Sequence, residues 1–444
     1  MSLIKERIKK IKDKFLAKYY SYIIKLSYFS NLPILKNFLI KNLTTGNKSK
    51  NIIWYLDYKR SEAEIKFLKK KKFKLLLTNI LFIKELILFL DKNDTFYLKK
   101  KNFFFNILNE LKVKVIVSSA IHYKVNIIGY SAKQFNIKFI VYHRECYNFS
   151  KLHLRGFEKT LIKFRKNFKF IDKLIVHNDI YKDKFIKFGK MDKKNVSIIG
   201  PLRFNKLKIV NKKANKNNNK IVFFGFTPTY SAWFNENPAL KNIKNLGPFG
   251  EINYYLDNNL NYKNLIEKNV YFYDHFIQSN LIFINNAIKF PKIKFEIKLK
   301  WEDHRWVSVI NKIIDLKIGK YPSNLRITAD KNYWNKIKES FLICGYGSTT
   351  LLEAAYLNVP AAQFICGELT NKKIYKNRSR LIGHEKSFNF IKNENDLSKL
   401  IADRKKIHNK KLIKYAKQNF FRFVANIDKE NIEKKFIKII IQSL

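Results

Sequence analysis

Short apolar runs of strand length alternate with longer stretches of mixed apolar and polar residues along most of the chain from Asn51 onward. This alternation is typical of a parallel sheet, in which strands are joined by helical crossovers. Five such runs lie in the first part of the chain: NIIWYL, FKLLLT, KVIVSS, KFIVYH and KLIVHN. Five more follow residue 219: KIVFFGF, KFEIKLK, LRITAD, FLICGYG and AAQFI. The pattern predicts an α/β protein with two parallel sheets.

Changes in composition divide the chain into five predicted parts. Residues 1–48 form a basic, amphipathic helical segment, residues 49–205 a first domain, and the Lys/Asn-rich residues 206–219 a linker. Residues 220–390 form a second domain, and 391–444 read as helices with lysine-rich faces. Within the second domain, residues 227–265 carry three of the chain's eight Pro, and we interpret them as an insertion or lid, because long ordered loops are usually functional.

The segment FLICGYGSTTLLEAAYLNVPAAQF, residues 341–364, reads as strand, glycine turn, helix and strand. Gly345 and Gly347 permit unusual backbone angles, and residues 348–350 are hydroxyl residues that favour a helix start. The free N–H groups and positive end of such a helix favour a phosphate. Glu353 follows one turn later, and the same residues also satisfy an ordinary capping box.

The stretch GSTTLLEAAYLNVPAAQF resembles the Ser/Thr-rich turn and Glu-containing helix of GT-B glycosyltransferases of capsule and surface-polysaccharide biosynthesis, and a related form occurs in the UDP-N-acetylglucosamine 2-epimerase group. The resemblance implies two Rossmann-like domains with a cleft between them, a nucleotide-sugar donor held by the second and a glycan or lipid-linked acceptor on the first. It also implies that Gly347, Ser348, Thr349 and Thr350 bind the donor phosphate, and that Glu353 binds the ribose.

The segment KLKWEDHR gathers cations at the end of a predicted strand, where they can stabilise charge on a departing phosphate. In many bacterial polymer-forming members of the resembled family, a Lys-x-His-Pro segment occupies this place. The chain lacks that proline, so its segment matches the family's only loosely. The resemblance implies that Lys300, His304 and Arg305 bind the substrate, and a solvated basic turn is the alternative interpretation.

Glycosyl transfer needs a base that takes a proton from the acceptor hydroxyl. His143 and Glu145, in YHRECY, follow a predicted strand of the first domain and are our catalytic candidates, ahead of His122 and Glu236. Polar residues at strand ends also cap sheets, which is the other interpretation of this cluster. In SSAIHYK, Ser118 and Ser119 belong to the same predicted edge of the sheet.

A net charge of +54 attracts polyanions such as nucleic acids. The lysines, however, are spread along the whole chain, and no RNA-binding aromatic signature or zinc-finger spacing occurs. We therefore expect no specific nucleic-acid partner. Residues 1–45 alternate lysines with Leu, Ile, Tyr and Phe, which fits either an anionic membrane surface or packing on the protein itself. Neither a signal peptide nor a transmembrane span is visible, so we expect a cytoplasmic protein, peripheral at most on the inner face of the plasma membrane.

No Asp-x-Asp pair, HExxH, CxxC or GxxxxGK[ST] occurs, so we expect no metal, no cofactor beyond the nucleotide-sugar co-substrate, and no ATPase. The expected function is metal-independent glycosyl transfer to a surface glycan. A glycerol- or ribitol-phosphate transferase or a nucleotide-sugar 2-epimerase of the same fold is the alternative, although an epimerase needs more carboxylates near the strand ends than the chain offers. An inactive scaffold of a polysaccharide assembly complex is the non-enzyme alternative.

Overall fold

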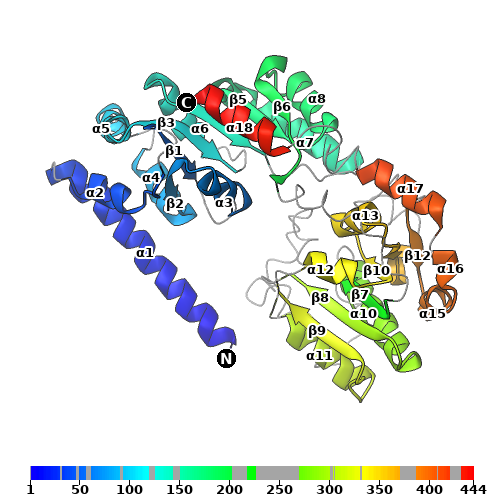
Figure 1. Ribbon diagram of the computed structural model, residues 1–444. Coiled ribbons are helices and arrows are strands. Elements are labelled where there is room, and N and C mark those ends of the chain that lie inside the picture. The colour runs from blue at the N-terminus through cyan, green and yellow to red at the C-terminus, as the bar shows by residue number, and fades with distance from the viewer. Residues whose placement is uncertain are drawn as a thin grey trace. The chain divides into compact units, whose positions relative to one another are not determined.

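The computed structural model describes residues 2–30, 33–46, 50–56, 62–90, 94–119, 126–143, 151–202, 218–226, 270–300, 304, 306–330, 333–370, 387–407, 409–420 and 432–444. The predicted linker lies largely outside them, as does the predicted lid. The chain forms two compact units (Figure 1). The first comprises residues 1–147, 155–209 and 421–444, and the second comprises residues 148–154 and 210–420.

The first unit contains a six-stranded sheet in the order β2-β1-β3-β4-β5-β6, with every pairing parallel. Its strands are β1 Ile52–Leu56, β2 Lys74–Thr78, β3 Val113–Ser118, β4 Lys138–Tyr142, β5 Lys173–Val176 and β6 Val196–Ile198. Its helices are α1 Ser2–Ser30, α2 Ile34–Lys41, α3 Glu62–Lys70, α4 Ile80–Phe89, α5 Tyr97–Glu110, α6 Asn126–Gln134, α7 Lys151–Phe164, α8 Asp179–Lys187 and α18 Ile432–Ser443.

The apolar strand residues and the inner faces of these helices form one core, because strands covered on both faces are apolar throughout. Trp54 on β1 donates from Nε1 to Thr78 Oγ1 on β2 at 2.8 Å, which satisfies the polar atom of a fully buried ring. The C-terminal helix α18 packs on the same unit through Phe436, whose ring lies 5.7 Å from that of Tyr142. Residues at the end of the chain therefore complete the first unit.

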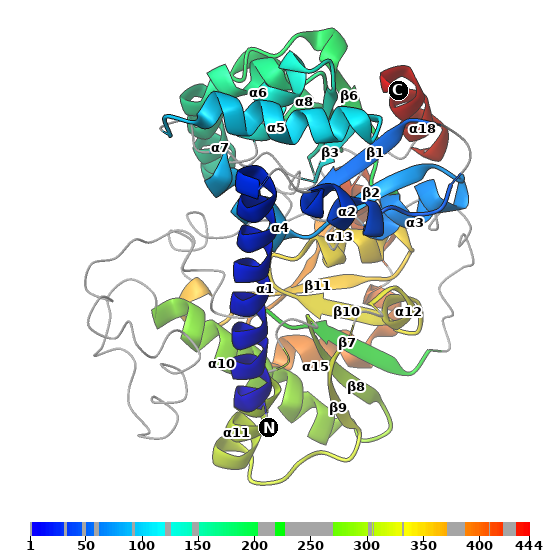
Figure 2. The same ribbon diagram turned by 90° about the vertical axis from the view of Figure 1, so that its left-hand side faces the viewer.

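The second unit contains a parallel sheet in the order β12-β11-β10-β7-β8-β9 (Figure 2). Its strands are β7 Lys220–Phe224, β8 Lys294–Leu299, β9 Leu325–Ala329, β10 Leu342–Gly345, β11 Ala361–Phe364 and β12 Asn389–Ile391. Its helices are α10 Val270–Lys289, α11 Trp306–Lys317, α12 Tyr333–Lys338, α13 Thr349–Tyr356, α15 Glu394–Ala402, α16 Arg404–Ile407 and α17 Lys410–Asn419. The predicted α/β class with two parallel, Rossmann-like sheets and a helical N-terminal segment is confirmed.

Among the helices that the structure describes, none combines the length and the apolar character needed to cross a bilayer.

Candidate functional site

The order in which the chain adds strands to the second sheet reverses between β7 and β10. From β7 the chain builds outward through β8 and β9, and then returns to place β10 on the other side of β7. The two strands pair in parallel, with Phe224 opposite Gly345 at their carboxyl ends. Open α/β sheets bind ligands outside the carboxyl ends of their strands, at such a reversal. A ligand site is therefore expected at the loops that follow Phe224 and Gly345.

The turn after β10 leads directly into α13, as the sequence predicts. Gly347 has φ +56°, a left-handed conformation that L side chains rarely adopt. Ser348 is the N-cap of α13, and its Oγ accepts a hydrogen bond of 3.2 Å from the N–H of Thr350. Asn358 has φ +60° and ends the helix region in the left-handed conformation typical of this position.

The N-terminus of α13 has the character of an anion site. Its first turn contains no acidic side chain, and residues 348–350 are only partly buried. The hydroxyl groups there can donate as well as accept, and the helix end carries partial positive charge. Glu353 lies one turn further on and is 2% exposed. These neighbouring residues, all predicted from the sequence, thus form one local cluster.

His275, in the first turns of α10, is a candidate that the sequence did not reveal. Its ring centroid lies 4.4 Å from that of Tyr346, the residue between the two glycines, and 5.0 Å from that of Phe226, just after β7. Its Nδ1 accepts a 3.1 Å hydrogen bond from the N–H of Cys366, just after β11. The ring therefore lies against the carboxyl ends of three strands, directly beside the turn that precedes α13.

The chemistry of His275 is that of a neutral donor. Burial lowers the pKa of this imidazole to about 3, so the ring is uncharged at physiological pH. Because Nδ1 is an acceptor, the ring proton is on Nε2, and Nε2 has no hydrogen-bond partner among the described residues. A buried donor without an acceptor is costly, which makes this atom a candidate for contact with a group outside the described chain.

Gly367 allows α10 to approach the end of β11 closely. It has φ +59°, and a Cβ at this position would come within 1.7 Å of the Asp274 Oδ2 atom. A side chain here would have to displace the Asp274 carboxylate and would strain the left-handed backbone.

The cationic candidates of the KLKWEDHR segment differ from one another in burial. Lys300 directly follows β8 at the carboxyl edge of the same sheet, and both Lys300 and His304 are exposed. Arg305 lies outside the described residues. Lys298, within β8, is buried and forms an ion pair of 3.7 Å with Asp330, so its charge is balanced inside the unit. Burial lowers the pKa of the Lys298 amine.

At the carboxyl edge of the first sheet, His143 directly follows β4, as predicted, and is 5% exposed. Its ring lies among Phe157, Tyr181 and Phe185, with centroid distances of 6.0, 5.9 and 5.5 Å. Glu145 lies outside the described residues, as do His122 and Glu236. The catalytic assignment of His143 and Glu145 stays a prediction.

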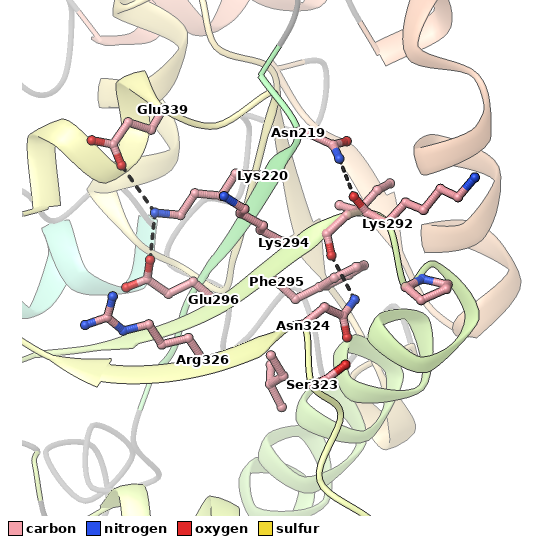
Figure 3. Close-up of a pocket in the computed structure, with 13 residues that line it drawn as sticks. Asn219, Lys220, Lys292, Lys294, Phe295, Glu296, Ser323, Asn324, Arg326 and Glu339 are labelled. Carbon is pink, nitrogen blue, oxygen red and sulfur yellow. Dashed lines mark hydrogen bonds and ion pairs between the residues drawn. The ribbon is translucent and has the colours of Figure 1, made fainter.

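A pocket of about 830 Å³ lies at the opposite, amino-terminal edge of the second sheet (Figure 3). Lys220 points between Glu296 and Glu339, with N–O distances of 2.8 and 3.4 Å. Asn324 donates to the carbonyls of Ala287, Phe290 and Ile293, which joins the loop before β9 to the end of α10. The paired charges and the location before the strands indicate a structural role, so we place the candidate site at the carboxyl edge.

Within the part of the chain that the structure describes, no three His, Cys, Asp or Glu side chains are grouped as metal ligands. The expectation that the protein works without a metal stays a prediction.

No protein-family model and no curated protein matches the chain. Among solved structures, the wall teichoic acid polymerase TagF is similar with a TM-score of 0.50 and 12% identity, over 99% of this chain and 97% of that one. A UDP-GlcNAc 2-epimerase from Methanocaldococcus jannaschii gives a TM-score of 0.49 at 12% identity over 88% of this chain and 99% of that one. A glycosyltransferase from Rickettsia africae ESF-5 gives 0.45 at 12% identity, over 89% and 99%. The similarity to TagF indicates a fold of the GT-B type.

Proposed function

We propose that the chain is a glycosyltransferase that moves a sugar from a nucleotide-sugar donor to a surface-glycan acceptor without a metal ion. The observation that carries the proposal is the glycine-flanked turn at the start of α13, located where the strand order of the second sheet reverses. The similarity to TagF supports the fold that this proposal assumes.

In this proposal the donor's phosphates lie against the N-terminus of α13. Ser348, Thr349 and Thr350 donate from their hydroxyls, and the helix end supplies positive potential. Gly347 leaves space for the close approach of a phosphate to the backbone, because it has no Cβ. Glu353 accepts hydrogen bonds from the ribose. Since Glu353 is buried, its replacement will change stability as well as affinity, so the two must be measured separately.

The reaction itself needs stabilisation of the leaving group and removal of a proton. Lys300, exposed after β8, and Arg305 are proposed to neutralise the charge that develops on the nucleotide phosphate. His143 or Glu145 is proposed to take the proton of the acceptor hydroxyl, a step worth roughly a hundredfold to ten-thousandfold in rate.

A glycerol- or ribitol-phosphate transferase is the second candidate. The observation that favours it is the similarity to a wall teichoic acid polymerase at a TM-score of 0.50. Such an enzyme uses the same anion site but transfers a phosphate-bearing unit, so a cytidine nucleotide would be the expected donor. A 2-epimerase would instead convert its nucleotide sugar without any acceptor, and a scaffold would do neither.

The experiment is a thermal-shift screen of the purified chain with UDP, CDP, CMP, GDP and ADP, with and without EDTA. A ligand at 100 times its dissociation constant stabilises a protein by about 2.7 kcal/mol, which is visible in the melting temperature. We expect one nucleotide to raise it equally with and without EDTA. Mass analysis after incubation with the matching sugar and polyol donors then identifies the reaction. No shift with any nucleotide would overturn the proposal.

A further inference from the structure

Helix α1 has two apolar faces, and one of them packs in the core of the first unit. Tyr20, Ile23 and Ile24 on the inner face are buried in the core of the first unit. The Tyr20 ring packs at 5.7 Å against that of Phe82 on α4, and its hydroxyl accepts a hydrogen bond of 2.7 Å from Asn79. Packing on the protein, one of the two roles expected for this segment, therefore holds for this face.

The outer face carries a row of large apolar side chains that are between 52% and 76% exposed, which we call the α1 stripe: Ile11, Phe15, Tyr19, Tyr22 and Phe29. At 100° per residue, these positions fall within an arc of about 80° and extend along about 27 Å of the helix. Figure 2 shows α1 as one continuous helix. Single exposed apolar residues are ordinary, but a continuous row on one face marks an interaction surface.

The charges beside the stripe indicate what it contacts. Lys12, Lys14, Lys18 and Lys25 are all exposed, and on a helical projection they lie beside the stripe. Asp13, the one acidic residue between positions 11 and 30, falls on the opposite side of the helix. Aromatic rings flanked by lysines suit the boundary between lipid headgroups and acyl chains, where lysine stems extend to the anionic phosphates.

We propose that the α1 stripe docks on an anionic lipid bilayer, with α1 lying in the plane of the surface. A second copy of the chain is the other apolar occupant, but two chains of net charge +54 repel each other, whereas an anionic surface attracts the lysines beside the stripe. The inference is independent of the transferase proposal, because vesicle binding and nucleotide binding are measured separately and either can fail alone.

The test compares three full-length proteins in vesicle sedimentation. The stripe variant is Phe15→Gln/Tyr22→Gln/Phe29→Gln, which keeps every charge. The control variant, Ile288→Gln/Leu316→Gln/Tyr321→Gln, removes three comparably exposed apolar side chains from the second unit. Vesicles contain either 30% phosphatidylserine in phosphatidylcholine or phosphatidylcholine alone, and circular dichroism checks that all three proteins are folded.

We expect the wild type and the control variant to bind the phosphatidylserine vesicles equally, with binding that weakens as salt is raised. The stripe variant should bind at least tenfold more weakly. Equal binding by all three proteins would attribute the affinity to the general positive charge and overturn the proposal. Failure of the wild type to bind would do the same, as would sedimentation analysis showing a wild-type dimer that the stripe variant abolishes.

Discussion

The N–H of Cys366 donates to Nδ1 of His275 at 3.1 Å, across 91 positions of sequence. This hydrogen bond joins the end of β11 to α10 and fixes which nitrogen of the imidazole carries the proton. The ring is fully buried between Phe226 and Tyr346, so it stays neutral. Because burial lowers the pKa of this imidazole in the folded state only, stability depends on pH.

We predict that His275 makes the second unit less stable as the solution is acidified. The folded pKa of about 3 lies below the ordinary value of 6.5, so the unfolded chain binds the proton more readily. Stability attributable to this group is fully present above pH 6.5 and is lost as the pH falls, by about 1.4 kcal/mol per pH unit.

Urea unfolding at pH 7.5, 6.0 and 5.0 checks this prediction with His275→Gln, which keeps an acceptor for Cys366 but does not titrate. The variant should lose less stability on acidification than the wild type, and His304→Gln controls for the removal of an exposed histidine. Parallel curves for the wild type and His275→Gln would show that the ring is not buried in its neutral form.

Cys344 and Cys366 should be inert thiols in the native protein. Both are buried with 0% exposure, and burial raises the pKa of each thiol, which suppresses the reactive thiolate. Iodoacetamide labelling at pH 8 followed by peptide mass mapping should modify neither residue in the folded state and both in urea. Rapid native labelling of either one would contradict the buried positions described here.

Glu296, which lines the pocket of Figure 3, forms a buried ion pair with Lys336, and Thr328 Oγ1 lies 2.5 Å from Glu296 Oε1. Burial alone would raise the pKa of this carboxyl, but the hydrogen bonds from Lys220, Lys336 and Thr328 hold it below its usual value. Glu296→Leu should cost about 1–3 kcal/mol, because Lys220 and Lys336 each lose this buried partner but keep Glu339 and Asp330, respectively.

Adding Lys336→Met to Glu296→Leu should recover part of that loss, since the ammonium that lost this partner is then removed. Unfolding free energies for the two single variants and the double variant give the coupling. The exposed pair Lys36–Glu110, at 2.8 Å, is the control, and Glu110→Gln should cost less than about 1 kcal/mol. Additive losses at Glu296 and Lys336 would mean that the pair is not coupled.

Much of the fold could be predicted from the sequence, because its strands are continuous apolar runs and its turns contain glycine or asparagine. The start of α13 was predicted correctly from Ser348, whose side chain caps the helix as expected. Strand β12 was missed, since Asn389–Ile391 is too short to show a period and is recognisable only by its pairing with β11.

The candidate site was predictable only where it is local in sequence. Residues 347–353 follow one another, so their arrangement is set by a single turn and helix. His275 reaches the same place through contacts with Phe226, Tyr346 and Cys366, which lie far apart along the chain. No spacing rule links these positions, and the histidine lies among both apolar and polar residues of α10. Similarly, the pairing of Lys298 with Asp330 depends on the adjacency of β8 and β9.

The N-terminus of α13 is proposed to bind the donor nucleotide. The most direct measurement is isothermal titration of UDP and CDP into the wild type, Ser348→Ala and Asn393→Ala. Asn393 caps α15 as Ser348 caps α13, each through one side-chain acceptor, so both variants should lose about 1 kcal/mol of stability. We predict that one nucleotide binds the wild type and Asn393→Ala equally but binds Ser348→Ala at least tenfold more weakly. Equal affinity for all three proteins would contradict the site.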